Sequence, residues 1–136
     1  MANRPTTIAR RHDLYEEAVQ IIEREYDLDL ELEDVARRIA TSRRQLQRAF
    51  AEAGGTSFRA QLAAVRMRHA LDLLSAGSAP VRAVAMTVGY RQPAQFAKAF
   101  RRHHGAAPSA LRSGDSGVSG GPASGEDRAV ARSLAA

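Results

Sequence analysis

The chain has 136 residues, of which 44% are hydrophobic, and it carries a formal net charge of +5. This is room for one ordinary domain with a core, and no apolar run approaches the roughly 20 residues of a membrane-spanning helix. Cysteine is absent, which excludes disulfides, zinc sites built on thiolates and cysteine nucleophiles.

The first predicted helix follows a polar N-terminal segment. Residues 1–12 are expected to be flexible. They lack the apolar stretch of a secretory signal, so a cytoplasmic location is expected for the protein. The helix is predicted to begin at Asp13, a candidate N-cap, and to end near Tyr26, because its apolar residues recur at helical spacing. A short helix is predicted next, from Leu32 to Ile39, with acidic residues in its first turn.

The segment TSRRQLQRAF, residues 41–50, is the most informative of the chain. Ser42 followed by Gln45 has the pattern of a capping box, which predicts that a new helix begins at Ser42. Only about three residues separate it from the preceding helix, and so short a connection is typical of a helix-turn-helix unit. Gly54 and Gly55 are predicted to end this helix, because glycine accepts the left-handed conformation.

The second half of the chain repeats this pattern after a longer helix. The longer helix is predicted over residues 57–74, and Gly77 and Pro80 mark its end. A short helix over residues 81–88 and a last major helix from Pro93 to His103 follow. No stretch shows the alternation of a strand, so the fold class is predicted to be all-α.

An internal repeat relates the two short-helix, turn and helix segments. The matched pairs are Val35 with Val84, Ala36 with Ala85, Ala40 with Gly89, Leu46 with Phe96, and Phe50 with Phe100. Most of these matches are apolar core positions, so the repeat by itself indicates a duplicated fold and no function. Residues 113–136 differ in kind, because they are rich in Gly and Ser, and they are predicted to form a disordered tail.

Charge is distributed very unevenly along the chain. Residues 1–36 carry a net charge of −6, whereas residues 37–112 hold fourteen Lys and Arg against only Glu52 and Asp72, a net charge of +12. A basic block of this kind attracts phosphate and raises affinity for nucleic acid. The alternative is a basic face that serves only solubility.

Three stretches resemble the DNA-binding domain of the AraC/XylS family of bacterial transcription regulators: LELEDVARRIATSRRQLQRAFAEAGGTSFRAQL, RMRHALDLL and PVRAVAMTVGYRQPAQFAKAFRRHHGAAPSALR. The resemblance covers residues 13–112. It implies about seven helices arranged as a homeodomain-like pair of helix-turn-helix units, residues 32–53 and 81–103, joined by the helix 57–74. Each unit would place one recognition helix in the major groove on the same face of the DNA, where successive entries lie ~34 Å apart.

Ten side chains are predicted to contact DNA. Base contact is assigned to Arg44, Gln47, Arg48, Gln95 and Lys98. Phosphate contact is assigned to Arg43, Arg91, Gln92, Arg101 and Arg102. Arginine grips guanine and glutamine grips adenine through paired hydrogen bonds. Because the second recognition helix exposes Ala94 and Ala97 in place of polar groups, the first unit is predicted to supply most of the sequence specificity.

The sequence therefore predicts a monomeric, sequence-specific regulator that binds double-stranded DNA, acts as an activator and needs no cofactor. No catalytic arrangement is recognisable, and none of the four histidines, His12, His69, His103 and His104, has the spacing of a metal site. Arg66 is expected to have a structural role. The acidic N-terminal face either orients the protein on DNA or contacts RNA polymerase, and the chain is expected to act as a stand-alone module. A protein-interaction adaptor and a non-specific nucleic-acid binder are the competing classes.

Overall fold

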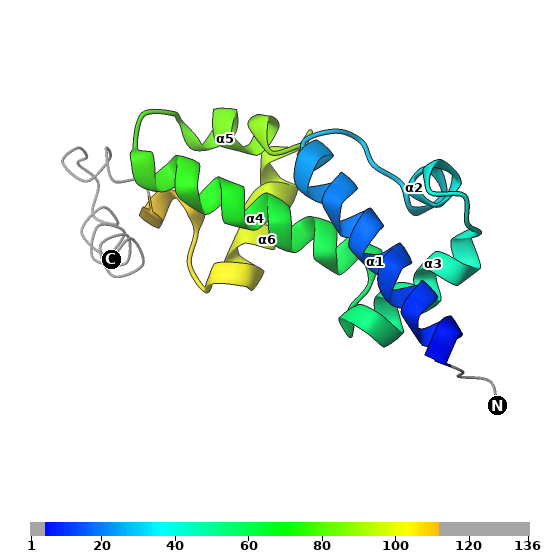
Figure 1. The fold of residues 1–136 in the computed structure, drawn as a ribbon. Coiled ribbons are helices and arrows are strands. Elements are labelled where there is room, and N and C mark those ends of the chain that lie inside the picture. Colours follow the sequence, from blue (N-terminus) through cyan, green and yellow to red (C-terminus); the bar gives the residue numbers. More distant parts are fainter. Residues whose placement is uncertain (1–4, 112–136) are drawn as a thin grey trace, which may run out of the picture. The chain divides into compact units, whose positions relative to one another are not determined.

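The computed structural model describes residues 5–111, and these residues form helices joined by short connections (Figure 1). The elements are α1 (Pro5–Glu25), α2 (Leu32–Arg38), α3 (Arg43–Ala49), a π-helical segment (Phe50–Gly54), α4 (Phe58–Ala76), α5 (Val81–Thr87), α6 (Pro93–His104) and a final 3-10 turn (Pro108–Leu111). The described residues contain no strand, which confirms the all-α prediction. Six of the elements are α-helices, where the resemblance implied about seven.

The chain divides into two compact units at Val65 and Arg66. The first unit contains α1, α2, α3 and the π-helical segment, and the second contains α5 and α6. Helix α4 begins in the first unit and continues into the second. In the described part of the chain, no helix has the length and apolar character needed to cross a membrane. The predicted tail, residues 113–136, lies outside the described residues.

Helix α1 begins earlier than predicted. It starts at Pro5, so Asp13 lies inside the helix and is not its N-cap, and residues 5–12 are helical instead of flexible. Proline suits a first helical turn, because its fixed φ matches the helix and its missing N–H would have no helical partner. The apolar pattern of the sequence gives no sign of these turns. Their one large apolar residue, Ile8, is 55% exposed and does not belong to the core.

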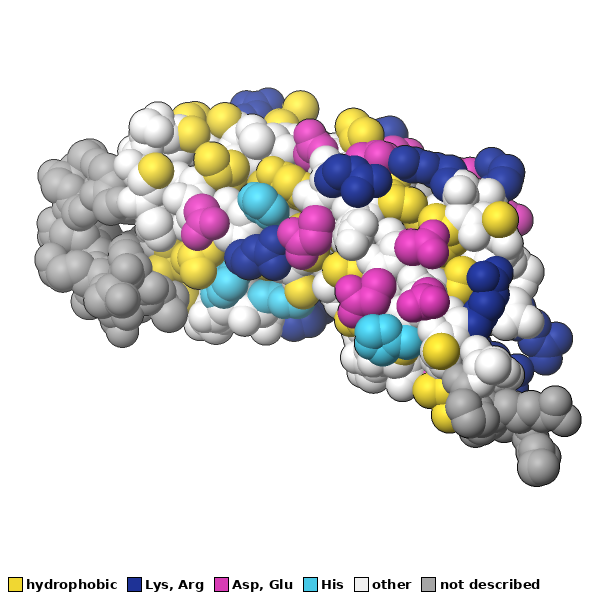
Figure 2. Space-filling model, viewed as in Figure 1, with side chains coloured by type: hydrophobic (Ala, Val, Ile, Leu, Met, Phe, Trp, Pro, Cys, Tyr) yellow, Lys and Arg dark blue, Asp and Glu magenta, His cyan; other side chains and the backbone are white. Residues whose placement is uncertain are grey.

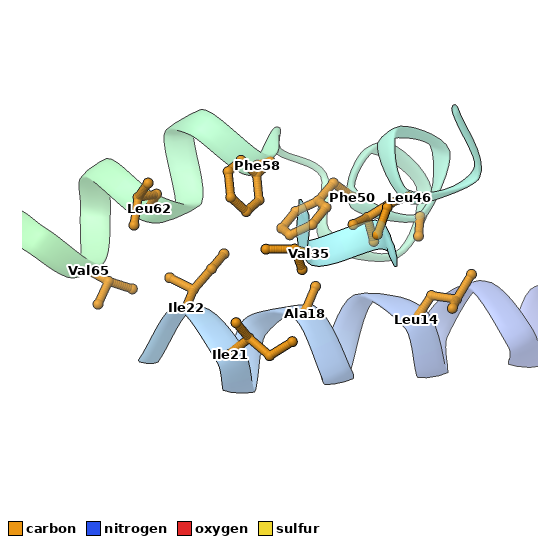
Figure 3. Packing of buried hydrophobic residues seen from close by; sticks show 12 residues of the cluster. Leu14, Ala18, Ile21, Ile22, Val35, Leu46, Phe50, Phe58, Leu62 and Val65 are labelled. Carbon is orange, nitrogen blue, oxygen red and sulfur yellow. The ribbon is translucent and has the colours of Figure 1, made fainter. Parts of the chain in front are cut away.

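The core of the first unit collects apolar side chains from every helix of that unit. Figure 3 shows Leu14 and Ile22 of α1 directed toward Val35, Leu46 and Phe50. All five are buried. The ring of Phe50 lies at the centre of an edge-to-face cluster, with its centroid 5.3 Å from that of Tyr15 and 5.9 Å from that of Phe58. Aromatic pairs favour this geometry, and it fixes the end of α3 against α1 and α4.

The second unit has its own buried set from α4, α5 and α6. Val84, Phe96 and Phe100 are almost fully buried, and the two phenylalanine rings lie 5.7 Å apart. Helix α4 contributes Met67 to this core, whereas Leu71 of the same helix is only half-buried. The matched apolar positions of the repeat are thus core residues in both units.

The two short turns also correspond. The side-chain oxygen of Ser42 accepts a hydrogen bond from the Gln45 backbone N–H at 3.1 Å, which confirms Ser42 as the N-cap of α3. Before α3 the chain turns at Ala40, with φ of +59°, and before α6 it turns at Gly89, with φ of +102°. Both repeats therefore require the left-handed region at the same turn position.

Replacing Ala40 with glycine is expected to stabilise the first unit. The left-handed region costs an L-residue roughly 1–2 kcal/mol, and the greater freedom of unfolded glycine offsets about 0.4–1 kcal/mol of that gain. Ala40→Gly should therefore raise the free energy of unfolding by roughly 0.5 kcal/mol, measured by urea denaturation. Gly89→Ala is the matched control and should lower it, because a Cβ at that φ would lie 3.1 Å from the Arg66 guanidinium. A loss of stability in Ala40→Gly would contradict this account of the turn.

A two-pronged ion pair joins the end of α1 to α2. Both terminal nitrogens of Arg38 donate hydrogen bonds to the Glu25 carboxylate, each at 2.7 Å. The hydrogen bond from Arg38 holds the pKa of Glu25 below its ordinary value of 4.5. Glu25 therefore stabilises the folded chain at pH above its unfolded pKa, and this contribution is lost as pH falls through the folded pKa.

Glu25→Gln is expected to lower the Tm near neutral pH and to have progressively less effect in acid. The protonated carboxyl of the wild type can no longer pair with Arg38, so the two melting temperatures should converge as pH falls below 4.5. The measurement is a series of thermal melts between neutral and acidic pH. Glu17→Gln, which removes the same charge from an exposed position on α1, is the control. A difference between wild type and Glu25→Gln that stays constant with pH would contradict the role of the ion pair.

Candidate nucleic-acid interface

Helix α3 separates its apolar and polar side chains sharply. Leu46 and Ala49 within the helix, and Phe50 directly after it, have no exposed surface. Arg44, Gln47 and Arg48 are exposed and are spaced by three and four residues, which places them on one side of the helix. The buried side fixes the helix against the core of the first unit, and the opposite side presents two guanidinium groups and one amide to solvent. Arg43, at the first position of the helix, is exposed as well.

Arg48 has a carboxylate neighbour of its own. Its Nε lies 3.8 Å from one oxygen of Glu52, one helical turn further along, and the other oxygen accepts a hydrogen bond from Arg11 of α1. The Arg48 side chain nevertheless remains 57% exposed. Exposed ion pairs at this spacing are worth only about 0.3–0.5 kcal/mol, so Glu52 restrains Arg48 only weakly.

Helix α6 has a comparable but less polar exposed side. Phe96 and Phe100 are buried, and Gln95 and Lys98 are exposed, as predicted. Ala97 is half-buried, and near the end of the helix Arg101 and Arg102 are exposed. The two residues before the helix, Arg91 and Gln92, are exposed too. All ten predicted contact residues are thus exposed, six of them in or beside the second helix-turn-helix.

Arg66 supports the turn that precedes α6. Its guanidinium carbon lies 5.5 Å from the centre of the Tyr90 ring, and the same group lies against Gly89. A cation over an aromatic face is a favourable contact, and the absence of a side chain on glycine makes room for it. Burial raises the pKa of Tyr90, although Arg66 and Arg102 oppose that effect. The structural role expected for Arg66 agrees with this position.

The two histidines at the end of α6 belong to the protein's own packing and surface. The ring of His104 lies 4.5 Å from that of Phe100, and its Nε2 is 3.2 Å from the Met67 carbonyl oxygen. Burial, together with the neighbouring His104 and Arg102, lowers the pKa of His103. Within residues 5–111, no cluster of three or more histidine and acidic side chains is arranged to hold a metal ion.

Acidic side chains occupy a different part of the first unit. Figure 2 shows Asp and Glu gathered over α1, and the exposed residues there include Asp13, Glu16 and Glu17. Sequence reasoning found this acidic helix but missed the role of Arg11. Its side chain is only 11% exposed, and its bond to Glu52 joins residues 41 positions apart. A helical pattern carries no signal for such a distant contact.

Comparison with known proteins agrees with this geometry. A family model described as "Helix-turn-helix domain" matches residues 35–114. The lactose operon transcription activator of Staphylococcus xylosus is 34% identical over 86 residues, which cover 63% of this chain and 31% of that protein. The transcriptional regulator RipA of Corynebacterium glutamicum is 39% identical over 87 residues, 64% of this chain and 26% of that protein. The chain therefore spans only about a quarter to a third of the length of these relatives.

Solved structures share this fold. The C-terminal domain of AraT, a response regulator from Geobacillus stearothermophilus, superposes with a TM-score of 0.68 at 32% identity, covering 70% of this chain and 79% of that one. The DNA-binding domain of AdpA, solved in complex with a target DNA, gives a TM-score of 0.66 at 30% identity, covering 74% of this chain and 90% of that one.

Proposed function

The chain belongs to the family of AraC-type helix-turn-helix domains, and on this premise we propose that it is a transcription regulator that binds double-stranded DNA at specific sequences. The observation that carries the proposal is the exposed side of α3, where Arg44, Gln47 and Arg48 stand opposite a fully buried apolar side. A helix fixed in this way can enter the major groove as a unit, with donors directed at base edges.

In this proposal the two helix-turn-helix units have different roles on DNA. Helix α3 reads bases, because arginine and glutamine can each form paired hydrogen bonds with one base. Helix α6 contributes limited base reading through Gln95 and Lys98. Its remaining cations bind phosphates, which position a protein on the duplex without reading sequence. The phosphate-binding set comprises Arg43, Arg91, Gln92, Arg101 and Arg102.

The proposal is tested by selecting binding sites from a random duplex library and then measuring affinity. At physiological salt, the selected duplex should bind about 1,000-fold more tightly than a random duplex of the same length, or better. Equal affinity for both would identify a non-specific nucleic-acid binder. Failure to bind either duplex at modest salt would favour a protein-interaction adaptor with an acidic partner.

Activation through RNA polymerase is the use that we propose for the acidic side of α1. The carboxylates of Glu16 and Glu17 are exposed, and they belong to a part of the chain whose charge disfavours contact with phosphate. Neutralising both as glutamine should reduce transcription from a promoter carrying the selected site and leave DNA affinity unchanged. Stronger DNA binding with unchanged transcription would indicate that the acidic side only orients the protein on the duplex. We propose that one copy of the chain suffices for binding, since it provides both recognition helices.

A further inference from the structure

Glu52 stands out in the basic part of the chain. It is one of only two acidic residues between positions 37 and 112, and it lies one helical turn after Arg48, a proposed base-reading residue. A carboxylate so close to a DNA-binding surface repels phosphate and weakens binding to every duplex.

The contacts of Glu52 fix which part of Arg48 it holds. Arg11, itself almost buried, donates a hydrogen bond from Nη1 to Oε1 of Glu52, and this anchors the carboxylate from the side of α1. The other oxygen, Oε2, lies 3.8 Å from Nε of Arg48. The ion pair thus engages the inner nitrogen of the guanidinium, next to the side-chain stem. It does not use the fork of terminal nitrogens with which arginine grips O6 and N7 of guanine.

We propose that Glu52 is a positioning residue that sets sequence selectivity through Arg48. It restrains the inner nitrogen of Arg48 while the terminal fork is directed at a base edge. The side chain then loses less conformational freedom on meeting the correct base. At a wrong sequence the fork finds no matching acceptors, and only the repulsion between Glu52 and phosphate remains. This inference rests on the proposed function, because it requires α3 to read bases.

The test compares wild type with Glu52→Gln on the selected and the random duplex. Glu52→Gln should bind the random duplex about twofold more tightly, because one repulsive charge is removed. Affinity for the selected duplex should stay the same or fall, so the ratio of the two affinities should drop about twofold or more. In a repeated site selection, preference should relax at the single base position that Arg48→Ala also relaxes. In the Arg48→Ala background, Glu52→Gln should leave all preferences unchanged.

Two further variants separate positioning from charge and from folding. Asp72→Asn removes the other acid of the basic block and should raise both affinities by the same factor. Glu52→Asp keeps the charge that compensates Arg11 but shortens the reach to Arg48, so it should relax the same base position even if Glu52→Gln is poorly folded. The inference is overturned if Glu52→Gln changes both affinities equally, or if Glu52→Asp keeps wild-type selectivity. A wild-type protein that does not discriminate between the duplexes would overturn the proposed function first.

Discussion

Arg44→Ala is expected to weaken binding to the selected duplex about fivefold to 150-fold, or ~1–3 kcal/mol, and to relax preference at one base position. The side chain is exposed on α3 and shares a side with Gln47 and Arg48. Truncation leaves the fold intact, because no core contact is removed, but in the proposed complex it leaves a base edge without its partner. Affinity for a random duplex should fall far less, because a base-directed fork contributes little there. The measurement is titration of both duplexes, followed by a repeated site selection.

Arg101→Ala provides the contrast. Arg101 is exposed near the C-terminal end of α6, and we propose that it contacts phosphate. Its removal should weaken binding to all sequences by a similar factor and reduce the slope of log affinity against log salt by about one. Arg44→Ala should leave that slope almost unchanged. Identical behaviour of the two variants in both measurements would contradict the division between base reading and phosphate anchoring.

Local patterns were sufficient to predict most of the helices and the exposed side of α3. Ser42 caps α3 because its hydroxyl can reach the backbone N–H three residues on, and that spacing is visible in the sequence. Leu46 and Phe50 recur with helical periodicity, so the same pattern that buries them leaves Arg44 and Arg48 exposed. The exposed residues of the candidate site were therefore predictable, because they lie on the side of α3 opposite the buried apolar residues.

Features that depend on distant contacts were not predictable in this way. The first turns of α1 have no apolar periodicity, yet Arg11 within them packs against Glu52 far along the chain. The ion pair between Arg48 and Glu52 follows from helical spacing, but the anchoring of Glu52 by Arg11 does not. Likewise, periodicity alone did not indicate that Met67 would be buried more deeply than Leu71.

Phe50→Ala is expected to destabilise the first unit by about 3–5 kcal/mol, the range observed when a buried phenylalanine is truncated in a packed core. Phe50 has no exposed surface, and its ring makes edge-to-face contacts with both Tyr15 and Phe58. Removing it takes away the side chain that holds the end of α3 to α1 and α4 at once. The loss is a large part of the whole stability of a small domain, which is about 5–15 kcal/mol. Urea denaturation followed by circular dichroism measures it.

The control removes an equally apolar side chain from the surface of the same unit. Ile8 is 55% exposed, so Ile8→Ala should change the free energy of unfolding by no more than about 0.5 kcal/mol. Similar losses in the two variants would mean that Phe50 does not occupy a packed core. Selective DNA binding should be lost in Phe50→Ala and kept in Ile8→Ala, although neither side chain is proposed to touch DNA. The reason is that the proposed base reading by Arg44, Gln47 and Arg48 requires a rigid helix, and the packing around Phe50 is what holds α3 in place.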